Sequence, residues 1–234
     1  MYYGAKRSAK LLRSHLVDAQ RRRGRHAEGA RNDQLLLDAA RDVFATQGSS
    51  ASVAAVAARA GLGIGSLYRR YGSKTELLQQ LCVMSMQQAI AAAAEALATD
   101  DPAEALTGYI RTCVARRTGA LAPLAGTFET TPQMWTLARR GRLLLDRIVR
   151  RAQQAGSLRP DVTSVDISWL IELFARGAPP AGTDAADDAE HTVHQRLLAI
   201  AIDGLYTGDP HPLPGRPPTA AHYGQRWQPP AAAE

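Results

Sequence analysis

Apolar residues recur along most of the chain at the spacing of a helix with one buried face. The first such stripe follows the pattern i, i+3, i+4, i+7, i+8 and consists of Leu36, Ala39, Ala40, Val43 and Phe44. It predicts a helix over 32–47 that Gly48 ends. Two short helical segments follow at 52–60 and 64–71, joined by a glycine-containing turn. The pattern therefore predicts one long helix followed by two short ones.

Residues that favour helix starts divide the remainder of the chain. Residues 73–76 read SKTE, the capping-box pattern in which the serine accepts from the third amide and the glutamate reaches back to the first. A long helix is therefore predicted from Ser73 to about residue 98. Further helices are predicted to start at Asp101, Thr131 and Thr163 and to span 189–206. No run of alternating β-branched residues is present, so we predict an all-α fold.

Charge and proline mark the two ends of the chain. Residues 1–31 hold nine basic and two acidic residues, whereas the whole chain has a net charge of only +6, so the rest is close to neutral. A basic arm at 1–30 indicates a polyanion partner, with a solvated tail as the alternative. Residues 208–234 contain seven prolines and few apolar side chains. We expect both ends to be disordered.

Several functional classes lack their sequence signals. No uncharged apolar stretch of about 18 residues and no secretory signal is present, so we expect a cytoplasmic protein without a membrane span. Cys82 and Cys113 lack zinc-site spacing and are expected to be buried thiols. No Walker, GxSxG or HExxH motif appears, so we predict no catalytic residues and no cofactor. His191 and His194 could begin a metal site, but a solvated helix face is favoured and no metal is predicted.

The most specific pattern lies between Arg31 and Leu78. A long helix followed by two short helices around a glycine turn has the parts of a helix-turn-helix DNA reader. Residues 39–44 read AARDVF, and residues 67–78 read LYRRYGSKTELL. Together with the intervening run, these residues resemble the DNA-binding domain of the TetR family of bacterial repressors.

The resemblance implies an organisation for the whole chain. It implies a three-helix DNA-binding domain at 31–78, with the helix-turn-helix motif at about 52–71, and a helical-bundle domain for ligand binding and dimerisation at 79–207. A homodimer on a palindromic operator is implied, with the helices at 164–177 and 189–206 as its interface and an unidentified small molecule as its effector. Apolar side chains expected in this interface are Leu170, Phe174, Leu197, Leu198, Ile200 and Ile202.

The resemblance also assigns candidate DNA-binding residues, namely Ser52, Ile64, Gly65, Ser66, Tyr68, Arg69, Arg70 and Lys74. Ser52 opens a helix, where anions are favoured, and Tyr68 and Lys74 suit backbone phosphates. Arg69 is best able to read a base, through a bidentate contact to guanine. The chain departs from the family where Gly63 replaces a hydroxyl cap and Arg70 replaces a histidine, which affects the details of the operator.

Aromatic and sulfur-containing side chains of the second domain either fill its core or line a ligand cavity. The candidates are Tyr109, Cys113, Phe128, Met134, Trp135 and Trp169, with Phe174 as a further aromatic residue and Glu129 and Glu172 as polar groups. Each residue taken singly favours the core interpretation. The family resemblance nevertheless implies a cavity within the bundle.

Two other classes of function stay open on the sequence. Ile64, Gly65 and Ser66 form a chemically weak reading surface, so a helical ligand-binding or interaction protein without DNA binding is one alternative. A small helical enzyme that uses the same cavity is the second and less favoured. A gel shift with the upstream DNA of the gene tests the first, and turnover assays test the second.

Overall fold

The computed structural model describes residues 29, 31–178, 189–206 and 211–228. All regular elements within these ranges are helices, as predicted, and no strand occurs among them. None of these helices is both long and apolar enough to cross a membrane. Most of the basic arm at 1–30 lies outside the described residues.

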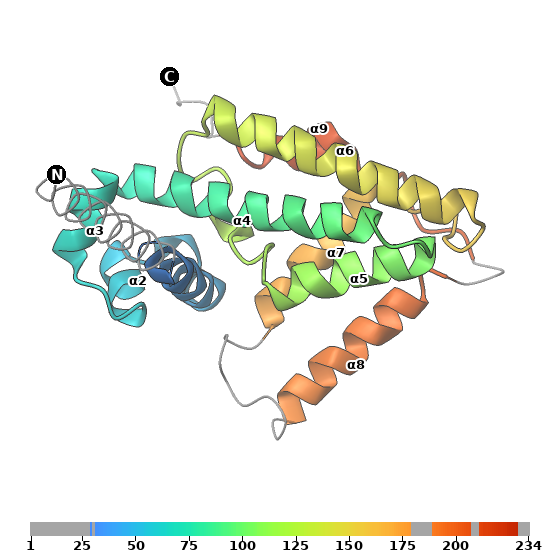
Figure 1. Ribbon diagram of the computed structural model, residues 1–234, viewed down its shortest axis with the longest axis horizontal. Helices are drawn as coiled ribbons and strands as arrows, with labels where there is room; N and C mark the ends of the chain where they lie inside the picture. Colours follow the sequence, from blue (N-terminus) through green and yellow to red (C-terminus); the bar gives the residue numbers. More distant parts are fainter. Residues whose placement is uncertain (1–28, 30, 179–188, 207–210, 229–234) are drawn as a thin grey trace, which may run out of the picture.

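The predicted helix-turn-helix forms at one end of the molecule (Figure 1). Residues 31–47 are helical, and α2 (Val53–Arg59) and α3 (Ile64–Tyr71) follow after the short 3-10 turn η1 (Gly48–Ser50). The turn between α2 and α3 depends on Gly61, whose φ of +67° favours glycine. The amides of Gly61 and Leu62 donate back to carbonyls at the end of α2, so α2 ends in a Schellman motif.

Two long helices form the spine of the molecule. In Figure 1, α4 (Lys74–Leu97) and α6 (Pro132–Gln154) lie side by side, and α4 reaches from the helix-turn-helix into the second domain. The helices α5 (Pro102–Ala115) and α7 (Ser164–Gly177) pack on this spine, and α8 (Ala189–Asp203) packs against α7 on the side away from it. The 3-10 turn η2 (Ala122–Leu124) lies between α5 and α6 in the chain.

Helix starts lie close to where the sequence predicts them. Asp101 and Thr131 accept backbone amides at the N-termini of α5 and α6, and both helices have proline at their first position. Thr163 forms a complete capping box with Asp166 at the start of α7. Ser73 also caps α4 by accepting from the Glu76 amide. The second half of the predicted capping box, a bond from the Ser73 amide to the Glu76 carboxylate, is not formed. The Glu76 carboxylate lies against Gly72 instead.

The buried apolar residues form two clusters. The first joins the helix at 31–47, α2, α3 and the start of α4 with Leu121, Leu124, Phe128 and Met134. The second joins the later part of α4 with α5, α6, α7 and α8. The first cluster contains residues from beyond 78, so the helices of the first domain share their core with the second domain.

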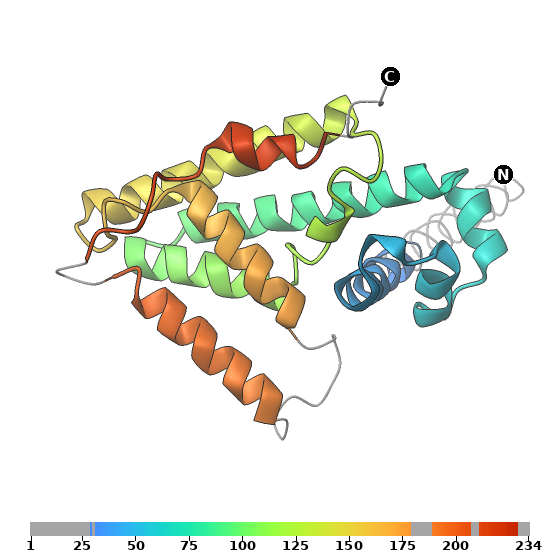
Figure 2. The ribbon, with the colours of Figure 1, turned by 180° about the vertical axis from the view of Figure 1, so that it is seen from behind.

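The C-terminal end differs from the disorder expected over 208–234. Residues 211–228 are described, and they include helix α9 (Ala220–Gln225). Thr219 caps this helix by accepting the His222 amide. Viewed from behind, α9 lies along α6 beside α7 (Figure 2). Proline content correctly indicates a lack of regular structure before α9, but packing against α6 and α7 orders the segment.

Candidate DNA-binding surface and ligand cavity

The recognition helix α3 has one buried side and one exposed side. Leu67 is buried and packs into the first apolar cluster. Ile64 and Tyr68 are each 44% exposed, and Gly65, Ser66 and Arg69 are also on the solvent side. Exposed apolar side chains that are surrounded by polar groups often mark a surface that contacts another molecule. This side of α3 has the shape and chemistry of a surface that contacts another molecule.

Two further candidates lie at helix starts beside this surface. The Ser52 hydroxyl oxygen accepts the Ala55 amide at 3.1 Å, so it caps α2 and keeps its own proton available for donation. Lys74 is the first residue of α4 and is exposed. Both residues can therefore reach a phosphate at a helix N-terminus.

The two arginines of α3 differ in their surroundings. Arg69 is exposed and donates to Ser66 at 3.0 Å, a contact between two exposed groups. Arg70 forms an ion pair with Asp33 at 2.7 Å, and the Tyr71 hydroxyl donates to the same carboxylate at 3.0 Å. Burial and the bond to Asp33 raise the pKa of Tyr71 to about 12. Arg70 therefore ties α3 to the helix at 31–47, a partner that the sequence did not indicate.

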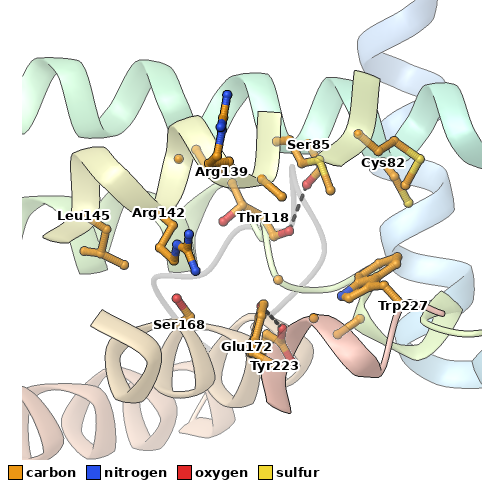
Figure 3. Close-up of a pocket in the computed structure, with 18 of the residues that line it drawn as sticks. Cys82, Ser85, Thr118, Arg139, Arg142, Leu145, Ser168, Glu172, Tyr223 and Trp227 are labelled. Carbon is orange, nitrogen blue, oxygen red and sulfur yellow. Dashed lines mark hydrogen bonds between the residues drawn. The ribbon is translucent and has the colours of Figure 1, made fainter. Parts of the chain in front are cut away.

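A cavity of about 610 Å³ lies in the second domain, close to the first (Figure 3). It is within the range of 300–1,000 Å³ that is typical of small-molecule sites. Its walls come from α4, Tyr109 of α5, the 118–122 segment, α6, α7 and the C-terminal segment 211–228. Most of the lining is apolar, with Met86, Leu121, Leu145, Ile171 and Trp227 among its members.

Three of the six predicted ligand-binding residues line this cavity, namely Tyr109, Met134 and Trp135. Cys113 and Phe128 are instead buried in the second and first apolar clusters. Trp169 does not line it either, but it packs on the C-terminal segment. Of the two polar candidates, Glu172 lines the cavity, whereas Glu129 is exposed.

The two thiols lie in apolar surroundings, as predicted. Burial raises the pKa of Cys82 to about 12 and that of Cys113 to about 11. Neither thiol is therefore a ready nucleophile or metal ligand near neutral pH.

The C-terminal segment closes one side of the cavity through Glu172. This carboxylate is only 4% exposed and accepts from the Tyr223 hydroxyl and, at 3.0 Å, from Arg226. The Arg226 guanidinium lies 4.0 Å from the centre of the Trp169 ring, and Tyr223 meets that ring edge to face. Burial and the neighbouring carboxylate raise the pKa of Tyr223. The residues 223–227, which read YGQRW, were the available sequence signal for this packing.

A buried ionic cluster joins the DNA-binding domain to the cavity. Asp42, on the helix at 31–47, accepts from the buried Arg117 and from the exposed Arg59 at 2.8 Å. Arg117 has a φ of 51°, in the left-handed region that a non-glycine residue seldom adopts. Arg41 is 1% exposed, and burial lowers its pKa to about 10. No pattern in the sequence indicated that Arg41 and Arg117 are interior residues.

Arg41 also reaches two residues of α4. It donates to Ser85 at 3.2 Å and to Gln88 at 2.7 Å. Ser85 in turn donates to the Thr118 carbonyl at 2.8 Å, and both Ser85 and Thr118 line the cavity. Because Ser85 belongs to the cavity wall, a single hydrogen bond from Arg41 links that wall to the helix at 31–47.

The surface of α8 carries an apolar stripe. Val193, Leu197 and Ile200 are exposed at helical spacing, and Leu173 of α7 is exposed as well. Leu198 and Ile202, which the sequence assigned to a dimer interface, are instead buried in the second cluster, and Leu170 and Phe174 pack against it. Helix rotation decides this difference, since only one side of α8 can face its own subunit.

His191 and His194 lie on α8, where Phe174 packs against the His194 ring. Burial lowers the pKa of His194. Among the described residues, no group of three histidine, cysteine or carboxylate side chains could hold a metal ion. The candidate third ligands Asp187 and Asp188 lie outside those residues.

Comparison with protein families gives two matches that together cover both domains. Residues 36–81 match the family described as bacterial regulatory proteins, tetR family. Residues 101–207 match the C-terminal domain described as transcriptional regulator SbtR-like. The second match ends before the C-terminal segment that closes the cavity.

Individual relatives agree with these matches. The chain is 25% identical over 181 residues to the HTH-type transcriptional regulator UidR of Escherichia coli, covering 74% of this chain and 91% of that protein. A TetR transcription regulatory protein from Mycobacterium vanbaalenii has a TM-score of 0.51 at 25% identity, over 78% of this chain and 99% of that one. The TetR regulator SCO0520 from Streptomyces coelicolor gives a TM-score of 0.51 at 22% identity, over 76% and 99%, and shows the fold alone.

Proposed function

We propose that this chain, which belongs to the TetR family of transcriptional regulators, is a repressor that binds a palindromic operator as a homodimer and leaves it when a small molecule fills the cavity. As a member of this family, it is a DNA-binding regulator and not an enzyme. The observation that carries the proposal is the short connection from the cavity through Thr118 and Ser85 to Arg41.

The proposed DNA contacts follow from exposure and chemistry. Ile64, Gly65 and Ser66 would face base edges, with Ile64 limited to apolar contacts such as a thymine methyl group. Ser52, Tyr68 and Lys74 would bind phosphates, while Arg70 would act chiefly through Asp33 to hold α3 in place. The basic residues at 21–31 would follow phosphates or the minor groove beside the domain.

The proposed release is a shift between two conformations. A ligand changes DNA affinity only if it binds one conformation better than the other. A ligand that moves the 118–122 wall would move the acceptor of Ser85 and hence the partners of Arg41. The helix at 31–47 would then carry α3 away from the spacing that the operator requires.

We expect phosphate-contacting and base-contacting residues to respond differently to substitution. Lys74→Ala should weaken binding by similar factors on operator and random duplexes and lower the salt slope by about one unit, because it removes one phosphate contact. Arg69→Ala should relax preference at one operator position by about 1–3 kcal/mol. Fluorescence anisotropy on a duplex selected from the DNA upstream of the gene measures both.

Tyr68→Phe should also weaken binding equally on operator and random duplexes, but by a smaller factor than Lys74→Ala, because it removes only a hydroxyl. A uniform loss for Arg69→Ala on all sequences would assign Arg69 to phosphate. Binding of the wild-type protein that shows no preference for any upstream fragment over random DNA would contradict the proposed function.

We expect the apolar stripe of α8 to form the centre of the dimer interface. Ile200 is 62% exposed, and Ile200→Glu would place a charge in that interface, where it lacks a partner. Sedimentation at micromolar concentration should then show monomer, with dimer affinity reduced at least about tenfold, which corresponds to 1.4 kcal/mol.

Leu143→Glu on α6 is the matched control, since Leu143 is similarly exposed but lies outside this stripe. It should leave the dimer intact. A wild-type protein that sediments as a stable monomer would contradict the proposed assembly.

A further inference from the structure

Most polar groups that line the cavity already have hydrogen-bond partners inside the protein, but its two arginines form no ion pair among the described residues. Its hydroxyl and carboxylate groups already have partners inside the protein: Ser85, Tyr109, Thr118, Thr130, Thr136, Ser164, Ser168, Glu172 and Tyr223. Arg139 and Arg142 are the charged lining residues that form no ion pair within the described part of the chain. A ligand that enters this cavity therefore meets apolar walls and unpaired positive charge.

Arg142 is the better placed of the two arginines. In Figure 3 it extends toward Ser168 across the cavity, whereas Arg139 extends away from Ser168. The carboxylate nearest along α6, Asp146, is one helical turn away and accepts from the hydroxyl of Ser164 at the start of α7. Arg142 thus brings a guanidinium group with hydrogen-bond donors to the edge of the space that a ligand would fill.

The negative charge of the cavity wall is cancelled by the chain itself. Glu172 is the carboxylate that lines the cavity, and Arg226 of the C-terminal segment pairs with it at 3.0 Å. An uncompensated buried carboxylate would repel an anionic ligand. With Arg226 in place, the local field is set by Arg142 and Arg139. The segment that provides Arg226 lies beyond residue 207, where the match to the C-terminal family domain ends.

We propose that the effector is an amphipathic organic anion whose charged group pairs with Arg142 and whose apolar body lies against the walls made by α4, α6 and Trp227. This inference rests on the proposed ligand-responsive function and adds the chemical class of the ligand. Arginine suits the role because its planar fork binds carboxylate, sulfonate or phosphate oxygens in pairs. Arg142 is itself exposed, so the pair would form where the cavity opens to solvent, with the apolar walls beyond it.

A pair of fluorescent probes tests this inference on the full-length protein. 8-Anilinonaphthalene-1-sulfonate is an apolar anion, and N-phenyl-1-naphthylamine is the same framework without the sulfonate. We expect the wild-type protein to bind the anion about three- to fivefold more tightly than the neutral probe, because an ion pair to an exposed arginine is partly screened by water. Equal affinity for the two probes would overturn the inference.

Substitutions then locate the anion. Arg142→Gln should weaken anion binding by about three- to fivefold, so that the preference for the anion is lost, and leave the neutral probe unchanged within error. Arg142→Lys should retain part of the preference for the anion, which separates a charge effect from misfolding. Arg150→Gln is the control, since Arg150 is exposed on the same helix but does not line the cavity. An equal loss in Arg150→Gln and Arg142→Gln would overturn the inference.

A filled cavity provides the last control. Ser168→Phe places a ring where Ser168 faces Arg142, so both probes should lose binding. Full anion affinity in that variant would put the probe outside the cavity and overturn the inference.

DNA release is measured separately, so that the two proposals can fail separately. Binding of the anion through Arg142 without loss of DNA affinity would contradict ligand release and leave the assigned ligand class standing. Equal release by the neutral probe and the anion would contradict the ligand class and leave ligand release standing.

Discussion

Asp42→Asn is expected to lower the free energy of unfolding by about 3–5 kcal/mol, because it leaves a buried charge without its partner. The Arg117 side chain is 7% exposed and pairs with Asp42 across the boundary between the domains. Its other contacts, to the carbonyls of Arg41 and Ala175, are long at 3.5 Å. An asparagine can accept one hydrogen bond from Arg117 but cannot balance its charge. Urea denaturation at a fixed protein concentration measures the loss.

The exposed partner of the same carboxylate provides the control. The Arg59 side chain is 52% exposed, and it lies 2.8 Å from Asp42. Arg59→Gln should change stability by less than about 1 kcal/mol, because an exposed pair is screened by water and salt. Losses of equal size in Asp42→Asn and Arg59→Gln would show that the Arg117 pair does not stabilise the domain boundary.

Gly119→Ala is expected to destabilise the protein by about 1–3 kcal/mol through overpacking. A Cβ atom at Gly119 would lie 2.7 Å from the Cα of Glu172 and 3.1 Å from its backbone nitrogen. These are backbone atoms of α7, so the clash can be relieved only by moving the helix or the 118–122 wall. Both line the cavity, and binding of the two fluorescent probes should weaken as well.

Gly108→Ala is the matched control with an effect of the opposite sign. Gly108 lies inside α5, is exposed, and has no atom within 4 Å of an added Cβ. Alanine there should stabilise the protein by about 0.5–1 kcal/mol, because glycine loses more backbone freedom on folding. Thermal unfolding of the two variants side by side should therefore move in opposite directions. If the Gly119→Ala protein were as stable as the Gly108→Ala protein, α7 would be able to shift without a measurable loss of stability, which would contradict the prediction.

Local patterns in the amino-acid sequence are enough to predict where the helices start and which class of protein they build. Asp101, Thr131 and Thr163 act on amides within one turn of their own positions, so a local pattern is enough to place α5, α6 and α7. The same holds for the glycine turn of the helix-turn-helix, whose hydrogen bonds close over a few residues. The family resemblance over 31–78 depends on such local patterns, and the family comparison agrees with it.

Which side chains share a site could not be predicted, because it depends on how the helices pack. Tyr109 and Cys113 lie on one side of α5, yet only Tyr109 lines the cavity, because neighbouring helices cover the thiol. From the sequence, Arg70 and Arg117 are expected to be surface charges. In the structure they pair with Asp33 and Asp42, which lie far from them in the chain. The C-terminal segment looked too polar and proline-rich to fold, and it is ordered by Glu172 and Trp169. Partners that are far apart in sequence leave no periodic signal, so their pairing follows only from how the helices pack.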